Sequence, residues 1–225
     1  MKIIYWSDYA CPFCYIGERI LKQAFKNLDT DEKLELIMKS FELDPSASKK
    51  VVSSTPERFA NKYGLTFERA LNRIEAISEM GKSAGIDFKY ASTKYTNTLD
   101  AHRLTKLAQS KNNFELAEKL SENLFDAYFT KNLELANNDV LIDAGVKAGL
   151  DENEIKNLLS SDKYEPEVRL DEREAMEKGI HSVPFFIVSG KYYISGAQSL
   201  ENMTETLKRG LNTQAMSCGI EGCSL

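Results

Sequence analysis

The sequence has little that would suit a membrane or a nucleic acid. Its 225 residues include no run that approaches the roughly 18 apolar residues of a membrane-spanning helix. The 29 Lys and Arg are outnumbered by 34 Asp and Glu, which gives a formal net charge of −5, and no basic run stands out. These absences argue against a membrane protein and against a nucleic-acid-binding surface.

A secretory signal peptide is also missing from this sequence. Met1 and Lys2 are followed by only four apolar residues before Ser7 and Asp8, whereas the apolar core of a signal peptide spans about 7–15 residues. We therefore expect a cytoplasmic protein. Its four cysteines form two close pairs, one near each end of the chain. In a reducing compartment such pairs are typical of catalytic, redox-sensing or metal-binding sites rather than of structural disulfides.

The first pair, Cys11 and Cys14, lies where a predicted strand is followed by a predicted helix. Residues 2–6 are rich in β-branched and aromatic side chains, which indicates a buried strand. Pro12 suits the first turn of a helix because its missing N–H is not needed there. From Pro12 onward, apolar residues recur at helical spacing, at Ile16, Ile20, Leu21, Ala24, Phe25 and Leu28. Cys11 is therefore predicted at or just before the start of a helix.

That position favours redox chemistry. A helix N-terminus presents unpaired N–H groups and the positive end of the helix dipole, so the Cys11 thiol should ionise more easily than a free cysteine. The thiolate is the species that attacks a disulfide. Cys14, almost one turn further along, is expected to be more shielded and to resolve a mixed disulfide by attacking Cys11. Pro12 and Phe13 carry no charge, and we expect them to adjust the redox potential and to shield one sulfur.

The remaining predicted elements place strands near both ends of the chain and helices between them. Residues 33–41 predict a second strand, parallel to the first, and residues 55–163 predict helices throughout. There follow a helix over 165–178, a strand over 182–188, a tight turn, a strand over 192–195 and a last helix over 200–211. This is the order of an α/β thioredoxin fold with a large all-helical insertion. We expect a discontinuous thioredoxin-fold domain over 1–45 and 164–213, a helical subdomain over 46–163, and a tail over 214–225.

Four segments together resemble a known family. They are Cys11-Pro12-Phe13-Cys14, residues 97–104 (Asn-Thr-Leu-Asp-Ala-His-Arg-Leu), residues 182–186 together with 195–198, and the tail pair Cys218 and Cys223. Over almost its whole length the chain is similar to the DsbA-like thiol-disulfide oxidoreductases. Among these it resembles the FrnE-like proteins, for which a C-x4-C tail is the distinguishing mark. The resemblance implies redox catalysis by the first cysteine pair, with no cofactor.

The resemblance also implies where a substrate binds. It implies a cis peptide between Val183 and Pro184, packed against the cysteine pair, which would leave the backbone of Val183 free to pair with an extended substrate. From the sequence alone, Pro184 could equally be a trans proline that opens an edge strand. The segment that begins at Asn97 would face the dithiol, which makes Asn97 a candidate groove residue. Helix capping is the ordinary role of a residue in such a position.

The tail pair, Cys218 and Cys223, leaves three alternatives open. The preferred one is an accessory dithiol that exchanges with Cys11 or protects it. The others are a four-thiolate zinc site completed by the first pair, and cysteines without a role in a loosely constrained tail. The two histidines, His102 and His181, are interpreted first as ordinary core or surface residues and second as groups that influence Cys11.

We therefore expect a thiol-disulfide oxidoreductase or disulfide isomerase that acts on protein dithiols and disulfides through a mixed disulfide. Glutathione or a thioredoxin-type reductant would recycle it, and we expect no cofactor, metal, nucleic acid or membrane. One alternative is a glutathione-dependent enzyme of the chromene-carboxylate isomerase or kappa-class transferase type, which typically carries serine where Cys11 stands. The other alternative is a chaperone-like binding protein that uses the helical block as its surface.

Overall fold

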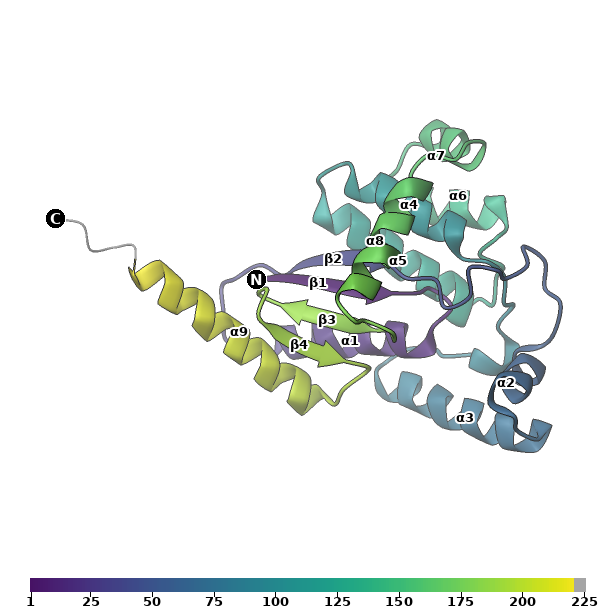
Figure 1. The fold of residues 1–225 in the computed structure, drawn as a ribbon, viewed down its shortest axis with the longest axis horizontal. Coiled ribbons are helices and arrows are strands. Elements are labelled where there is room, and N and C mark those ends of the chain that lie inside the picture. Colours follow the sequence, from purple (N-terminus) through teal and green to yellow (C-terminus); the bar gives the residue numbers. More distant parts are fainter. Residues whose placement is uncertain (221–225) are drawn as a thin grey trace.

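A four-stranded sheet in the order β2-β1-β3-β4 lies at the centre of the computed structural model, which describes residues 1–220 and the side chains of residues 1–212 (Figure 1). Its strands are β1 (Lys2–Ser7), β2 (Glu35–Ser40), β3 (Phe185–Val188) and β4 (Tyr192–Ser195). As predicted, β1 pairs in parallel with β2; it pairs antiparallel with β3, which forms a hairpin with β4. At the hairpin turn Ser189 and Gly190 have φ values of 51° and 70°, the left-handed conformation that a tight two-residue turn requires.

Strand β1 is apolar from Ile3 to Trp6, because helices cover both faces of the sheet. Side chains alternate along a strand, so Ile3 and Tyr5 pack into one cluster of buried residues and Ile4 and Trp6 into another. Figure 1 shows α8 crossing one face and α1 on the other. The first cluster includes side chains of α1 (Pro12–Lys26) and α9 (Leu200–Ile220), and the second includes those of α8 (Glu165–Glu177) and the residues after it.

The segment between β2 and α8 is helical, as predicted. Its elements are α2 (Thr55–Tyr63), α3 (Phe67–Ser83), the short 3-10 helix η1 (Tyr90–Ser92), α4 (Leu99–Gln109), α5 (Phe114–Phe129), α6 (Asn138–Ala148) and α7 (Glu152–Leu159). Buried side chains run without a break from the sheet into this block, through Tyr9 and Phe125 among others. The predicted boundaries near residues 45 and 163 fall in loops, and the division into two domains stays a prediction.

The last helix is longer than predicted. Its expected end lay near Leu211, yet α9 runs to Ile220. A helix is maintained by local backbone hydrogen bonds, so it can continue where no apolar stripe marks it. The side chain of Cys218 and the whole of Cys223 lie outside the described residues, and the three alternatives for that pair stay predictions. Within the described part of the chain, no helix is both long and apolar enough to cross a membrane.

Candidate active site

Cys11 is the N-cap residue of α1, at the position that the sequence predicts. Its backbone is extended (φ −89°, ψ 115°), and Pro12 is the first helical residue. The amide of Cys14 donates to the carbonyl oxygen of Cys11 at 3.1 Å and closes the first turn. That turn contains no acidic residue. The sulfur of Cys11 therefore lies at the end of a helix that favours an anion, with no carboxylate in the same turn to oppose it.

The two cysteines are free thiols 3.4 Å apart, and their surroundings differ. Cys11 is 4% exposed and lines a cavity, whereas Cys14 is fully buried. Burial raises the pKa of the Cys14 thiol, and the hydrogen bond and the charge of Cys11 raise it further. Cys14 is therefore protonated at neutral pH, and Cys11 is the sulfur that a substrate in the cavity reaches first.

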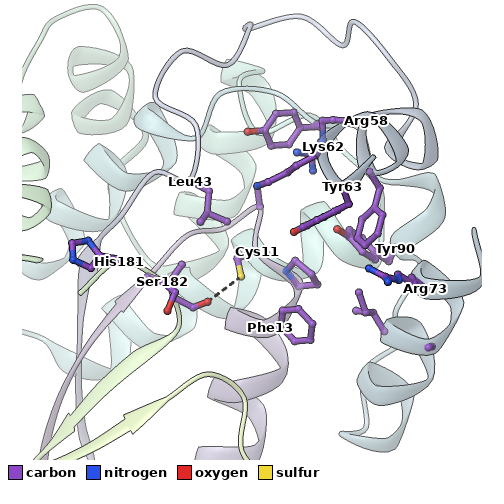
Figure 2. Close-up of a pocket in the computed structure, with 17 residues that line it drawn as sticks. Cys11, Phe13, Leu43, Arg58, Lys62, Tyr63, Arg73, Tyr90, His181 and Ser182 are labelled. Atoms are coloured by element: carbon purple, nitrogen blue, oxygen red, sulfur yellow. Dashed lines mark hydrogen bonds between the residues drawn. The ribbon is translucent and has the colours of Figure 1, made fainter. Parts of the chain in front are cut away.

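The loop before β3 brings Val183 to the sulfur of Cys11. The Val183–Pro184 peptide is cis, as the resemblance implied. The Cys11 thiol points at the carbonyl oxygen of Val183 at 3.6 Å, which is the dashed line in Figure 2. Pro184 is buried behind this loop and packs on α1 at Gly17, where an added Cβ would lie 3.1 Å from the Pro184 Cγ. Gly17 thus allows α1 and the proline loop to approach closely.

A cavity of about 510 Å³ opens beside Cys11. Its walls come from the cysteine motif, from α2 and α3, and from the loop before Pro184 (Figure 2). It is lined by Ala10, Cys11, Pro12, Phe13, Leu43, Arg58, Phe59, Lys62, Tyr63, Arg73, Ala76, Ile77, Tyr90, Tyr95, His181, Ser182 and Val183. The lining therefore combines aromatic rings with basic side chains and contains no Asp or Glu. Cavities of this size and composition are typical of small-ligand sites.

Sequence reasoning missed the buried pair Asp8 and His102, which lies directly behind the cysteine motif. The carboxylate of Asp8 accepts hydrogen bonds from the amides of Ala10 at 3.1 Å and Leu43 at 2.8 Å. The Nε2 atom of His102 lies 3.6 Å from the same carboxylate, and neither ring nitrogen has a closer partner. Burial acts to raise the pKa of Asp8, but His102 and the two amides outweigh it and hold that pKa below its ordinary value. The sequence offers His102 as a group that influences Cys11 and places Asp8 three residues before Cys11, but it does not indicate that the two side chains meet.

The other predicted site residues fall into two groups. Pro12, Phe13 and Val183 line the cavity, and Phe13 is 36% exposed. Asn97 does not line it. The Asn97 side chain accepts from the amide of Leu99 at 2.9 Å and donates to Glu42 at 3.2 Å, which are the contacts of a capping and loop-bracing residue. A role for Asn97 in substrate binding stays a prediction.

The two histidines occupy different places. His102 is fully buried, whereas His181 is exposed at the margin of the cavity, with Ser182 between it and Cys11 in Figure 2. Within the described residues, no three His, Cys, Asp or Glu side chains come together in a way that could hold a metal ion.

Comparisons with known proteins identify relatives of this chain and structures that share its fold. A probable DsbA oxidoreductase of Streptomyces coelicolor, SCO1869, superposes with a TM-score of 0.87 at 31% identity, over 94% of this chain and 90% of that one. The uncharacterized protein YwbO of Bacillus subtilis strain 168 is 25% identical over 199 residues, which are 85% of this chain and 88% of YwbO.

Two further structures share the fold at lower identity. A 2-hydroxychromene-2-carboxylate isomerase has a TM-score of 0.70 at 14% identity, over 96% of this chain and 98% of that one. The cytosolic disulfide reductase DsbM of Pseudomonas aeruginosa has a TM-score of 0.63 at 13% identity, over 95% of this chain and 100% of that one. The family model of the DSBA-like thioredoxin domain matches residues 2–208. The chain therefore belongs to the DSBA-like thioredoxin domain family.

Proposed function

We propose that this protein is a thiol-disulfide oxidoreductase that acts on protein dithiols and disulfides through Cys11 and Cys14. One observation carries the proposal. Cys11 caps the N-terminus of α1 and lines a cavity, while Cys14 lies 3.4 Å away, fully buried, with a raised pKa. The Cys11 sulfur is thus placed to attack a substrate, and the Cys14 sulfur stays protonated and buried until a mixed disulfide forms.

The exchange proceeds in two balanced steps. The Cys11 thiolate attacks one sulfur of a substrate disulfide, so that the substrate S–S bond breaks, a mixed disulfide forms, and the released substrate thiolate takes up a proton. Cys14 then loses its proton and attacks Cys11, which releases the second substrate thiol and leaves a Cys11–Cys14 disulfide. Two electrons pass from the protein to the substrate. The reverse sequence oxidises a substrate dithiol, and attack on the mixed disulfide by another substrate thiol gives isomerisation.

Val183 supports the substrate in this scheme. Its carbonyl oxygen already faces the Cys11 sulfur at 3.6 Å, so a substrate sulfur bound to Cys11 lies next to the Val183 backbone. An extended peptide can pair with such a free backbone edge. Phe13, which is 36% exposed and lines the same cavity, offers an apolar contact to this peptide.

The direction of electron flow depends on the potential of the dithiol relative to its compartment. We place the activity in the cytoplasm, where the glutathione potential is about −220 to −320 mV. Glutathione or a thioredoxin-type reductant is then the candidate recycling partner, and the fold shared with DsbM, also solved with GSH, supports the first of these. Membership of the FrnE-like subgroup stays a prediction.

Single substitutions of the two cysteines test the proposal. Cys11→Ser should abolish insulin reduction, and Cys14→Ala should accumulate mixed disulfides, which mass spectrometry detects. Pro184→Ala should slow turnover and weaken this trapping. Equal residual activity in the two cysteine variants would reject the assigned roles.

Two other outcomes would point to the alternative functions. Glutathione-dependent isomerisation without disulfide activity would favour an enzyme like the chromene-carboxylate isomerases. Suppression of aggregation that survives loss of all four cysteines would favour a chaperone-like binding protein.

A further inference from the structure

Three cations line the wall of the cavity that faces Val183 and Ser182. Arg58 and Lys62 come from α2 and Arg73 comes from α3, and Figure 2 shows them with Tyr63 on one side of Cys11. Within the described residues, none of the three forms an ion pair with a carboxylate. This wall therefore presents positive charge that the protein does not neutralise.

Arg58 is the most firmly held of these cations. Its guanidinium carbon lies 3.6 Å from the centroid of the Tyr95 ring, a cation–π contact that fixes the side chain against the cavity wall. The Nε atom of Arg58 is buried and has no hydrogen-bond partner. A buried donor without an acceptor costs free energy.

The absence of carboxylates at this wall contrasts with the rest of the molecule. The chain carries a net charge of −5, and several exposed lysines elsewhere pair with a carboxylate at 2.5–2.8 Å: Lys82, Lys89, Lys131, Lys147 and Lys156. Three carboxylates whose charges act on Tyr95 in the cavity lining have other partners: Asp8 pairs with His102 and two amides, Glu42 with Arg169, and Asp44 with the neutral hydroxyl of Ser46. An anion that enters the cavity therefore meets cations without a competing internal partner.

The size of the cavity limits the ligand. A volume of about 510 Å³ suits a molecule of a few hundred daltons, and the rings of Phe59, Tyr63 and Tyr90 give it apolar walls. A protein reductant would present its thiols from outside and would leave such a cavity largely empty. The lining thus favours a small molecule that combines negative charge with a sulfur able to reach Cys11.

Resting on the proposed function, we infer that the cavity binds a low-molecular-weight thiol or disulfide that carries carboxylates, and that Arg58, Lys62 and Arg73 hold those carboxylates. The small disulfide reoxidises the dithiol in two steps. Cys11 thiolate attacks it, which forms a mixed disulfide and releases one small thiol, and Cys14 then displaces the second small thiol. Two electrons leave the protein, and the reverse sequence reduces it. Charge selection by these three side chains then decides which small thiol exchanges with the protein.

A charge series of small disulfides tests this inference on the reduced protein, with all of residues 1–225 present. Glutathione disulfide is anionic, bis(2-hydroxyethyl) disulfide is neutral and cystamine is cationic. Acid quenching and mass spectrometry give the rate constant of each, and reaction with dithiothreitol corrects for intrinsic reactivity. We expect glutathione disulfide to exceed cystamine by at least about tenfold after this correction, with an advantage that shrinks as salt rises from 0.05 to 0.5 M.

Charge reversal at the cavity provides the matched variants. Arg73→Glu and Lys62→Glu alter exposed side chains, so folding should be preserved, and each should lower the ratio of the glutathione disulfide rate to the cystamine rate by about tenfold. Arg69→Glu makes the same charge change on α3 at an exposed residue that does not line the cavity, and should leave that ratio within twofold.

The outcomes separate this inference from the function on which it rests. Reaction with all three disulfides at the relative rates seen with dithiothreitol would overturn the inference and leave the proposed function standing. Equal changes of the ratio in Arg73→Glu and Arg69→Glu would overturn the inference in the same way. Failure of every disulfide to react with the reduced protein would instead contradict the proposed function itself.

Discussion

The thiol of Cys11 lies 3.6 Å from the carbonyl oxygen of Val183, although 172 residues separate the two along the chain. This contact joins the start of α1 to the loop that enters β3, because β1 and β3 are neighbours in the sheet. The attacking sulfur and the backbone edge for a substrate are therefore held by the same central strands. A substitution that displaces either loop should therefore lower the rate of thiol exchange more than it lowers the stability of the fold.

The unequal environments of the two thiols predict an order of alkylation. A brief treatment of the reduced protein with iodoacetamide at pH 7 should label Cys11 and leave Cys14 unlabelled, because burial and the neighbouring Cys11 raise the pKa of the Cys14 thiol. Raising the pH should increase labelling of Cys14. Peptide mapping by mass spectrometry distinguishes these two cysteines from the pair near the C-terminus. Comparable labelling of both at pH 7 would contradict the assignment, and the unfolded protein, in which both react, is the control.

The position of the dithiol could be predicted from sequence because its determinants are local. A β-rich run, Pro12 and an apolar helical stripe lie within one short segment, and the observed α1 begins at Pro12. The same holds for the hairpin turn at Ser189 and Gly190, where a short polar link joins two β-rich runs. Patterns that involve neighbours in the chain are visible without a structure.

The surroundings of the dithiol could not be predicted, because they depend on packing between distant elements. His102 is on α4 and meets Asp8 only once the helical block has folded over the sheet. The cation wall has a similar origin: Arg58 and Arg73 lie on two different helices, and only their packing places both beside Cys11. Asn97 shows the converse case, since the resemblance gave it a groove role while its contacts are those of a capping residue.

Asp8→Asn should destabilise the protein in a pH-dependent way. Both carboxylate oxygens of Asp8 accept a backbone amide, from Ala10 and from Leu43, and an asparagine would turn an NH2 group toward one of them. The pKa of Asp8 is lower in the folded state than in the unfolded chain, where it is near 3.9. The ionised Asp8 therefore contributes fully to the free energy of unfolding above the unfolded pKa, and this contribution is lost as the pH falls through the folded pKa. We expect a loss of about 2 kcal/mol at pH 7 and a smaller loss at pH 3.

Urea denaturation of the wild type and of Asp8→Asn at both pH values measures this difference. Asp31→Asn is the control, because Asp31 is exposed and should change stability little at either pH. An equal loss at pH 7 and pH 3 for Asp8→Asn would show that its carboxylate charge is not what stabilises the loop before Cys11.

Gly17→Val should slow thiol exchange more than it lowers stability. Gly17 packs on Pro184, and even a Cβ would lie 3.1 Å from the Pro184 Cγ, so valine must push the proline loop away from α1. A displacement of Val183 by a fraction of an ångström should reduce the rate of insulin reduction by about tenfold. Thermal unfolding and the insulin assay, run on the same preparations, separate the two effects.

Gly145→Val provides the matched control for that substitution. A Cβ at Gly145 would lie 2.6 Å from the Cδ1 atom of Ile155, so valine crowds the contact between α6 and α7, far from the dithiol in the chain and outside the cavity lining. It should lower the unfolding temperature while the folded enzyme keeps its exchange rate. Equal rate effects from the two variants would contradict the role given to the Gly17–Pro184 contact.

Arg103→Lys should destabilise the helical block without changing the chemistry of the cysteines. Arg103 lies next to His102, but its guanidinium points away from the cavity lining and into the segment between α7 and α8. It donates to the carbonyl oxygens of Leu158 and Lys163, each at 2.8 Å, to that of Ser161, and to the carboxylate of Asp100 at 2.7 Å. Lysine has a single ammonium group in place of the planar guanidinium with its several N–H donors, so it leaves buried carbonyl groups without donors.

We expect Arg103→Lys to lower the free energy of unfolding in urea by about 2–3 kcal/mol, whereas Arg69→Lys, an exposed change on α3, should lower it little. Exchange rates and the alkylation order of Cys11 should match the wild type in the folded Arg103→Lys protein. A slower exchange at unchanged stability would instead assign Arg103, and with it the segment that follows Asn97, to the substrate site.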